Sequence, residues 1–467
     1  MADELPKSTD LLVIGGGPGG YAAAFEAAWL GLDVTLVNAE DALGGVCLRR
    51  GCIPSKTLLH LNELVHSAAA AADAGLSYEP PSVDLDTLRE HKDKVIKQLT
   101  SGVAQLCRQR GVRVLQAQVS FIDAGHVQLD GPDSGRLAFT SAIIATGSRP
   151  VALPGMDFGA RIMSSTEALE LVDIPQTLLI IGGGYIGLEL GMVYQALGTK
   201  VTLAEATDRL MAGADADLVK PLARVVHQRF EAVYLNTQAS DLQAGDDDVR
   251  VILDTGDDAL DQRFERVLVA VGRTPNTEDL GLENAGIDCD GYGFITVDAA
   301  RRTSADNIHA IGDAAGGQML AHEAMHEGKA AARAISGQNA VFDPRAVPAV
   351  VFTDPQIAWC GLTEAELRDT MRNVKVLRYP WQASGRAISM GAGNGLTKLL
   401  VDADTGRVLG VGMVGPQAES LIAEAVLAIE MGATAEDMAA AIHPHPTLSE
   451  TVGEGAELFF GQTTHYG

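Results

Sequence analysis

Two cysteines, Cys47 and Cys52, are the residues of this 467-residue chain whose type and spacing most directly suggest chemistry. On a regular helix, residues five apart lie roughly 7–9 Å from each other, which is too far for a disulfide. A bridge therefore requires an irregular turn, which Gly44, Gly45 and Gly51 would permit. A disulfide in a reducing compartment is usually catalytic, and a thiolate at a helix N-terminus has a lowered pKa and is reactive. The alternative is two unrelated buried cysteines.

The element that precedes the cysteines occurs twice. Residues 11–20 read LLVIGGGPGG and residues 178–187 read LLIIGGGYIG. Each copy is followed at the same distance by a second apolar strand, so each predicts strand, glycine turn, helix and strand. In such a unit the first glycine permits the tight turn, the second admits a pyrophosphate, and the third lets the helix pack on the strand. The two predicted dinucleotide sites use Gly15, Gly17 and Gly20, and Gly182, Gly184 and Gly187.

The residue at the end of the second strand selects the nucleotide. Glu205 can accept hydrogen bonds from ribose hydroxyls and would repel a 2′-phosphate, which favours NAD over NADP. The same place in the first unit holds Asn38, and Glu40 could assist it. Two dinucleotide sites in one chain imply a relay between exchangeable NAD+/NADH and a flavin that stays bound.

Composition and charge exclude several classes of partner. The chain carries 35 Lys and Arg against 61 Asp and Glu, a net charge of −26, so nucleic acid and anionic lipid are disfavoured. A basic protein partner would suit this surface, although acidity can serve solubility alone. We expect no signal peptide, membrane span, metal site or disulfide framework, which favours a bacterial cytoplasm over a mitochondrial matrix.

Residues 43–56, LGGVCLRRGCIPSK, resemble the active-site signature of the pyridine nucleotide–disulfide oxidoreductase family, in particular of members that oxidise dihydrolipoyl groups. Further motifs of the family follow in order, so the resemblance spans about residues 10–455. They are 145–147 (ATG), 271–276 (VGRTPN), 310–314 (AIGDA), 319–322 (MLAH), 351–355 (VFTDP) and 443–450 (HPHPTLSE).

The resemblance implies an α/β protein with two three-layer Rossmann-like domains, one for FAD and one for NAD, and an α+β dimerisation domain. We expect a flavin domain over 1–149 and 272–346, the latter including the central segment, interrupted by an NAD domain over 150–271. An interface domain is expected over 347–467. The apolar segment 407–435 predicts a strand and a buried helix at a subunit interface.

The resemblance also assigns roles in catalysis. It implies that Cys47 exchanges with the lipoyl disulfide and that Cys52 passes electrons to a tightly bound FAD, one per subunit. His445 is expected to arrive from the partner subunit of a homodimer as the base, oriented by Glu450. A thiol near its ordinary pKa needs such a base at neutral pH.

Further contacts follow from the same resemblance. Lys56 is expected near the flavin, paired with Glu189, although alone these would be read as solvated charges. The expected flavin contacts are Gly15, Gly17, Gly20, Asn38, Glu40, Gly45, Val46, Lys56, Val119, Thr146, Gly147, Asp313, Met319, Leu320, Ala321 and His322. The expected NAD contacts are Gly182, Gly184, Tyr185, Ile186, Gly187, Glu189, Glu205 and Gly272.

The chain departs from the family pattern at several positions. Asn38 replaces an acidic residue, and Val119 stands where glycine is common. Arg49 and Arg50 lie between the cysteines, where they would lower a thiolate pKa or simply face solvent. His443 is expected to be structural. The remaining cysteines are expected to be ordinary buried thiols: Cys107, Cys289 and Cys360.

The implied activity is oxidation of protein-bound dihydrolipoyl groups by NAD+. The lipoyl arm would belong to an acyltransferase or carrier protein of a 2-oxo acid dehydrogenase complex or of glycine cleavage. The nearest rival is an NADPH-dependent glutathione reductase, against which Glu205 and Gly187 argue. A mercuric reductase would carry a C-terminal cysteine pair, and a flavin transhydrogenase would lack Cys47 and Cys52. A scaffold role could coexist with catalysis.

Overall fold

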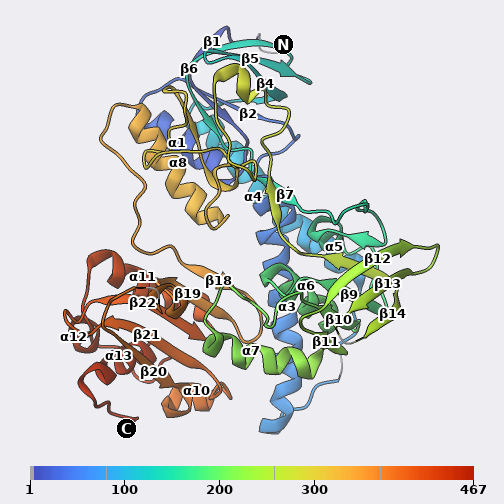
Figure 1. Ribbon diagram of the computed structural model, residues 1–467, viewed down its shortest axis with the longest axis vertical. Coiled ribbons are helices and arrows are strands. Elements are labelled where there is room, and N and C mark those ends of the chain that lie inside the picture. The colour runs from blue at the N-terminus through green and yellow to red at the C-terminus, as the bar shows by residue number, and fades with distance from the viewer. Residues whose placement is uncertain (1–4, 80, 257, 369, 467) are drawn as a thin grey trace. The chain divides into compact units, whose positions relative to one another are not determined.

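The computed structural model describes residues 5–79, 81–256, 258–368 and 370–466. These residues form two compact units, each of which gathers separate stretches of the chain (Figure 1). The first unit comprises Met1–Thr57, Asp84–Val151 and Gly272–Asp343, and the second comprises Leu58–Val83, Ala152–Val271 and Pro344–Gly467.

The first unit is built on a seven-stranded sheet in the order β3-β2-β1-β6-β5-β4, with β17 paired to β6. Strands β3, β2, β1, β6 and β17 run parallel, whereas β5 and β4 extend the sheet antiparallel. The strands are β1 (Ser8–Ile14), β2 (Val34–Asn38), β3 (Arg113–Gln116), β4 (Gln118–Asp123), β5 (His126–Asp130), β6 (Gly135–Ile144) and β17 (Ile308–Ala310).

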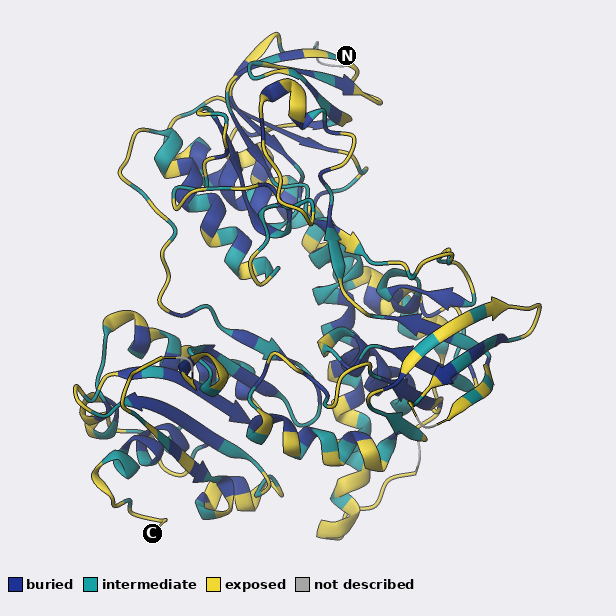
Figure 2. Cartoon of the chain, viewed as in Figure 1, coloured by how far each residue is buried: buried dark blue, intermediate teal, exposed yellow. Residues whose placement is uncertain are grey.

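Helices cover one face of this sheet. The helices α1 (Pro18–Trp29) and α8 (Ala321–Ile335) pack closely on each other, and α4 (Leu85–Gln109) lies beside α1. The last four residues of β1 are buried, because their side chains enter two different apolar clusters alternately, one on each face (Figure 2). The strand ends that carry the glycine turn therefore sit on a rigid core.

The second unit repeats the dinucleotide-binding arrangement. A parallel sheet has the order β11-β10-β9-β15-β8. A three-stranded antiparallel sheet, β12-β13-β14, is formed by the residues between β11 and β15 in the sequence. The parallel strands are β8 (Ile162–Met163), β9 (Thr177–Ile181), β10 (Lys200–Ala204), β11 (Ala232–Tyr234) and β15 (Arg266–Val269). The antiparallel strands are β12 (Gln238–Ala244), β13 (Val249–Asp254) and β14 (Ala259–Phe264), and the main helices are α6 (Tyr185–Ala196) and α7 (Ala216–Arg229).

The C-terminal part of the second unit is a five-stranded antiparallel sheet in the order β18-β19-β22-β21-β20. Its strands are β18 (Ala349–Val351), β19 (Ile357–Gly361), β20 (Val374–Pro380), β21 (Leu396–Asp402) and β22 (Val408–Val414). The helices are α9 (Glu364–Arg368), α11 (Ala418–Met431), α12 (Ala435–Ala440) and α13 (Glu450–Glu457).

The α/β class, with two Rossmann-like sheets and an α+β C-terminal part, is confirmed. Within 407–435, β22 and α11 are the expected strand and helix. The four predicted domain boundaries and the interface role of α11 stay predictions. Among the described residues, no helix combines the length and apolar character needed to cross a membrane.

Candidate active site

The two glycine turns have the same geometry. Gly15 has φ +109° and Gly182 has φ +111°, a left-handed backbone that favours glycine. A Cβ at Gly20 would lie 1.9 Å from the carbonyl oxygen of Gly15, and one at Gly187 would lie 2.2 Å from that of Gly182. The first and third glycines are therefore required by the turn itself.

The second glycine of each turn instead faces free space. A Cβ on Gly17 would meet nothing closer than 3.9 Å, and one on Gly184 would meet nothing within 4 Å. Both residues precede a helix, α1 or α6, whose first backbone N–H groups have no intrahelical partner. This open cradle at a helix N-terminus fits the phosphates of a dinucleotide.

The residues expected to bind ribose also brace their own glycine turns. The amide oxygen of Asn38 accepts a hydrogen bond from the N–H of Gly16 at 3.1 Å, and a carboxylate oxygen of Glu205 accepts one from Gly183 at 2.6 Å. The amide nitrogen of Asn38 donates to the carbonyl oxygens of Glu40 and Ala42. Asn38 thus keeps the bracing role despite lacking a charge, and its contact with ribose stays a prediction.

The helix that carries the two cysteines is broken between them. Cys47 lies in α2 (Gly45–Arg50) and Cys52 begins α3 (Cys52–Ala70), while Gly51 has φ −143° and ψ −108° and belongs to neither helix. The two cysteines consequently approach to near 2.8 Å without a disulfide bond between them. The irregular turn that the sequence required for a bridge is therefore present, and the pair can form a disulfide by a small movement.

The environment of Cys47 does not favour its thiolate. The hydrogen bond with Cys52 and then burial raise the pKa of Cys47, whereas the positive charge of Lys56 opposes them. Two thiols this close ionise as a coupled pair, so the second proton is the harder to remove. Cys47 therefore needs a base rather than a helix dipole alone.

Arg49 and Arg50, expected either to lower a thiolate pKa or to face solvent, both have acidic partners. Both guanidinium groups pair with the carboxylate of Glu40, and Arg49 also bonds Asp41 at 2.9 Å. The two positive charges are thus neutralised by nearby carboxylates. Lys56 is the cation that opposes the rise in the pKa of Cys47. Glu40, expected to assist at the flavin ribose, is already engaged by the two arginines.

The second flavin motif is held by residues far apart in sequence. Asp313, in a short 3-10 turn (η3, Gly312–Ala315), accepts a hydrogen bond from the hydroxyl of Ser148, and Nε of Arg273 lies 3.9 Å from its carboxylate. Thr146 and Asn276 bond each other's backbone carbonyls at 2.7 and 3.0 Å. These bonds gather the motifs at 145–147, 271–276 and 310–314 in one unit.

The other expected flavin contacts have defined positions in the first unit. Gly45, with φ +55°, and Val46 begin α2, where a Cβ on Gly45 would lie 2.7 Å from Gly17 Cα. Val119 is buried in β4 and packs in the core, so only its backbone could reach a cofactor. The strip Met319, Leu320, Ala321 and His322 leads into the start of α8.

His445 and Glu450 form a pair in the second unit. Nδ1 of His445 lies 2.7 Å from a carboxylate oxygen of Glu450, and the other carboxylate oxygen accepts the N–H of Thr447 at 2.6 Å. Burial opposes ionisation of Glu450, but the bonds from Thr447 and His445 outweigh it and lower its pKa. The imidazole is mostly exposed, so it is oriented on one side and accessible on the other.

Glu189 is buried in α6, where its carboxylate accepts the N–H of Phe352 at 2.9 Å. Its expected partner, Lys56, belongs to the first unit, and their pairing stays a prediction. The same holds for the meeting of Cys47 with His445. Tyr185 and Ile186 begin α6, and Gly272, with φ +144°, follows the parallel sheet.

One expectation about the remaining residues is wrong. Cys107 and Cys360 are buried, but Cys289, which forms an isolated β-bridge with Ile295, is exposed. His443 bonds Glu424 at 2.8 Å through Nε2, as a structural histidine would. Sequence reasoning assigned no role to Ser148 or Arg273, although Arg273 lies inside the quoted motif 271–276.

Comparison with known proteins shows the family to which the chain belongs. The sequence profile described as pyridine nucleotide-disulphide oxidoreductase matches residues 9–328, and that of its dimerisation domain matches residues 347–456. Proteins named dihydrolipoyl dehydrogenase are similar along almost their whole length. The one from Vibrio cholerae is 43% identical, covering 97% of this chain and 96% of that protein, and the one from Thermus scotoductus is 45% identical, covering 98% and 99%.

Solved structures give the same picture. LpdA from Mycobacterium tuberculosis has a TM-score of 0.89 at 27% identity, covering 96% of this chain and 99% of that one. The HOCl-induced flavoprotein disulfide reductase RclA from Escherichia coli, in its Cu(II) complex, has a TM-score of 0.86 at 26% identity, covering 97% and 100%. With its paired cysteines, its two dinucleotide turns and these matches, the chain belongs to the pyridine nucleotide-disulphide oxidoreductase family.

Proposed function

We propose that this protein is a dihydrolipoyl dehydrogenase, which oxidises dihydrolipoyl groups on another protein and transfers the electrons to NAD+. The observation that carries the proposal is the Cys47–Cys52 pair, brought together by the break at Gly51 directly after a dinucleotide turn. The similarity to proteins of that name over nearly the whole chain supports the choice of substrate.

The residues of the chain supply the thiol chemistry. The dihydrolipoyl thiolate attacks the oxidised Cys47–Cys52 disulfide at Cys47, and Cys52 leaves as a thiolate stabilised near Lys56. The second substrate sulfur then displaces Cys47, so the substrate is oxidised to lipoyl and the enzyme pair is reduced by two electrons. His445 takes up the proton of the attacking thiol, and Glu450 stabilises the resulting charge. FAD, when bound, supplies the two-electron transfer between the dithiol and NAD+.

The cofactor assignments follow from the two turns. FAD would lie on Gly15, Gly17 and Gly20 with Asp313 beside it, and NAD+ on the second turn. Glu205 uses one carboxylate oxygen for Gly183 and the other for Thr207, which leaves free lone pairs for a ribose and places negative charge where a 2′-phosphate would lie.

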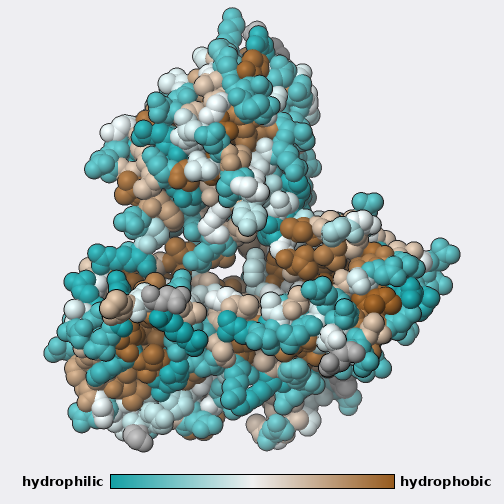
Figure 3. Space-filling view, viewed as in Figure 1, coloured by the Kyte–Doolittle hydropathy of each residue, from teal (hydrophilic) through white to brown (hydrophobic). Residues whose placement is uncertain are grey.

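A homodimer would complete the site. The match to a dimerisation domain supports this assembly, and exposed apolar side chains on and near α11 include Leu427, Met431 and Ile442. Figure 3 shows hydrophobic surface over the C-terminal part of the second unit. His445 would then serve Cys47 of the partner subunit. A lipoylated acyltransferase or carrier protein would be the substrate, met in the cytoplasm.

The test compares two reactions of the FAD-loaded enzyme. NAD+ reduction by free dihydrolipoamide should be fast, should vanish in Cys47→Ser, and should persist in Cys289→Ser, a matched control at an exposed cysteine. NADPH-dependent reduction of glutathione disulfide should be negligible. The opposite pattern would overturn the substrate and nucleotide assignments, while leaving the disulfide chemistry in place.

A further inference from the structure

Glu327 is a buried acidic residue that has no part in the proposed electron path. It lies in the middle of α8 with 1% of its surface exposed. One carboxylate oxygen accepts the N–H of Gly312 at 2.5 Å, and the other pairs with Nη2 of Arg301 at 2.7 Å. A charge so deeply buried is tolerated only when it is paired and hydrogen-bonded, so these two contacts define what Glu327 holds.

The hydrogen bond from Gly312 fixes the turn that presents Asp313. Gly312 has φ +61°, and a Cβ there would lie 2.9 Å from the Cβ of Ala324 on α8, so the turn is pressed against that helix. On the other side, Ser148 and Arg273 hold the Asp313 carboxylate. Glu327 therefore fixes the backbone of the turn while the other two residues fix its side chain.

The part of α8 around Glu327 also packs against the first glycine turn. Gly328 follows Glu327, and a Cβ at Gly328 would lie 2.7 Å from the carbonyl oxygen of Gly19 in the first turn of α1. A displacement of α8 at Glu327 would thus move both the Gly312–Asp313 turn and the helix expected to hold the phosphates.

Arg301 is held in place as the counterion. It has φ +65°, which is uncommon for a residue with a side chain, and its carbonyl oxygen accepts the N–H of Ala310 at 3.0 Å. Its guanidinium carbon lies 5.7 Å from the centre of the Phe342 ring, and its side chain is mostly buried. The strained backbone and the packed guanidinium place one positive charge beside Glu327.

We propose that Glu327, with Arg301 as its counterion, is a positioning residue for the flavin, because it holds the Gly312–Asp313 turn in the orientation that lets Asp313 contact the flavin. This inference rests on the proposed flavin site. It assigns to Glu327 no contact with the cofactor and no step in the reaction.

The ionisation of Glu327 gives this role a pH dependence. Burial raises the pKa of Glu327 to about 7; Arg301 and the N–H of Gly312 oppose the shift, and the nearby charges of Glu323 and Asp313 add to it. The ion pair with Arg301 needs the carboxylate form. Lowering the pH from 8 to 6 should therefore loosen the turn and speed the loss of FAD.

The test measures the affinity and dissociation rate of FAD, with the visible circular dichroism of the bound flavin as a second readout. Glu327→Ala should bind FAD about tenfold more weakly or worse, since it removes a charge-assisted bond to the turn. Glu327→Gln keeps an acceptor for Gly312, so it should recover part of this loss, and its dissociation rate should lose the pH dependence. Arg301→Gly relieves the positive φ but removes the counterion, and it should also weaken binding.

The matched control is Arg333→Gln. This residue lies on the same helix and pairs with Glu26 of α1 at 2.7 Å, away from the Gly312 turn, so its variant should bind FAD within twofold of wild type. If Glu327→Ala does not fold, Glu327→Gln and Arg301→Gly decide the question. Wild-type affinity and an unchanged pH dependence in those two variants would overturn the inference. A wild-type protein that binds no FAD would instead overturn the proposed function.

Discussion

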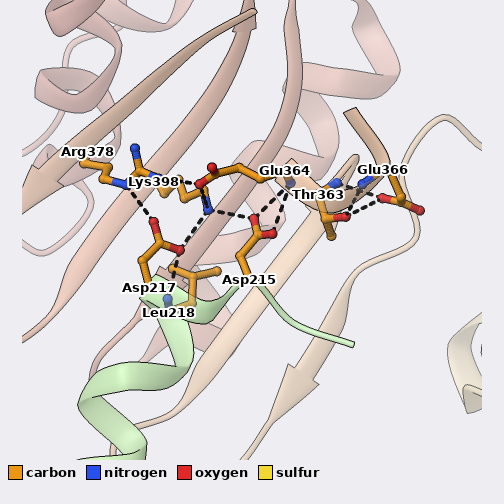
Figure 4. Close-up of polar contacts among 8 residues, drawn as sticks. All are labelled: Asp215, Asp217, Leu218, Thr363, Glu364, Glu366, Arg378 and Lys398. Atoms are coloured by element: carbon orange, nitrogen blue, oxygen red, sulfur yellow. Dashed lines mark hydrogen bonds and ion pairs between the residues drawn. The ribbon is translucent and has the colours of Figure 1, made fainter. Parts of the chain in front are cut away.

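A buried ammonium group joins two parts of the second unit, and its removal should strongly destabilise that unit. Lys398, in β21, has 1% of its side chain exposed and bonds Asp215 at 2.7 Å and Asp217 at 2.8 Å, and it also pairs with Glu364 (Figure 4). Asp215 and Asp217 lie at the start of α7, whereas Glu364 belongs to α9. The second cation, Arg378, pairs with Asp217 and Glu364 at the more exposed side of the cluster.

The change Lys398→Met would leave three carboxylates with one arginine. Removing one partner from a buried ionic cluster costs about 3–5 kcal/mol, because the remaining charges stay buried without compensation. That loss should lower the Tm of the second unit by roughly 6–20 °C. Arg378→Met is the matched control, since the arginine side chain is 43% exposed, and screening by water should limit its cost to about 1 kcal/mol.

The pH dependence distinguishes this reasoning from a simple packing defect. Burial opposes ionisation of Asp217, but the bonds from Lys398 and Arg378 outweigh it and lower its pKa, so in wild type its contribution is lost only below about pH 4. Lys398 likewise has a raised pKa, because its three carboxylate bonds outweigh burial, and its contribution is lost only in strong alkali. In Lys398→Met the carboxylates repel one another. The loss of stability relative to wild type should therefore shrink as the pH falls from 7 to 4 and the carboxylates become protonated.

Scanning calorimetry of the FAD-loaded enzyme between pH 4 and 9 measures both effects, with hydrogen exchange of β20 and β21 to locate the change. The reasoning would be refuted if Lys398→Met lost no more stability than Arg378→Met at pH 7. It would also be refuted if the stability lost by Lys398→Met did not vary with pH.

Three other changes test the site and its supports. Glu450→Gln should reduce NAD+ reduction by dihydrolipoamide about 10- to 100-fold without loss of FAD, because the carboxylate that orients His445 is gone; unchanged turnover would show that the pair is not used. Gly51→Ala should slow disulfide formation by Cys47 about tenfold or more, measured by trapping free thiols, because its Cβ would lie 2.9 Å from a carbonyl oxygen of the preceding turn. His309 is buried, and burial with the charge of Arg302 lowers its pKa to about 4, so it costs stability as the pH falls from 6.5 to 4. His309→Leu should recover up to about 3 kcal/mol at pH 4 in calorimetry, and equal acid losses in both proteins would contradict this.

The sequence predicted best those features in which chemistry and backbone geometry are adjacent in the chain. The repeated glycine pattern located both turns, since the close approach of Gly20 to Gly15 is a property of the turn alone. The spacing of Cys47 and Cys52 required a break in the helix, and the break falls at Gly51, where an added Cβ would lie 2.9 Å from the carbonyl oxygen of Val46.

Charge partners that lie far apart in the sequence were not predictable from the residues alone, because they depend on how distant segments meet. Lys398 bonds an acid 183 positions away, and Arg301 reaches Glu327 from another part of the fold. The acidic partner of Arg49 and Arg50 was not predicted either, although Glu40 lies only nine and ten residues before them in the chain. No pattern in the sequence indicated that Lys398 is buried within β21.

The division of the chemistry between the two units has a consequence for reactivity. The thiol pair lies in the first unit, where Cys52 and burial raise the pKa of Cys47, so this part alone holds a poor nucleophile. The oriented base, His445 with Glu450, lies in the second unit with its imidazole open to a partner. Under the proposed function, the nucleophile is the substrate thiol, which attacks the disulfide at Cys47 and loses its proton to a histidine from another chain. Assembly of the dimer would thus control when the dihydrolipoyl substrate is oxidised, because an unassembled subunit would hold the cysteine pair without the base.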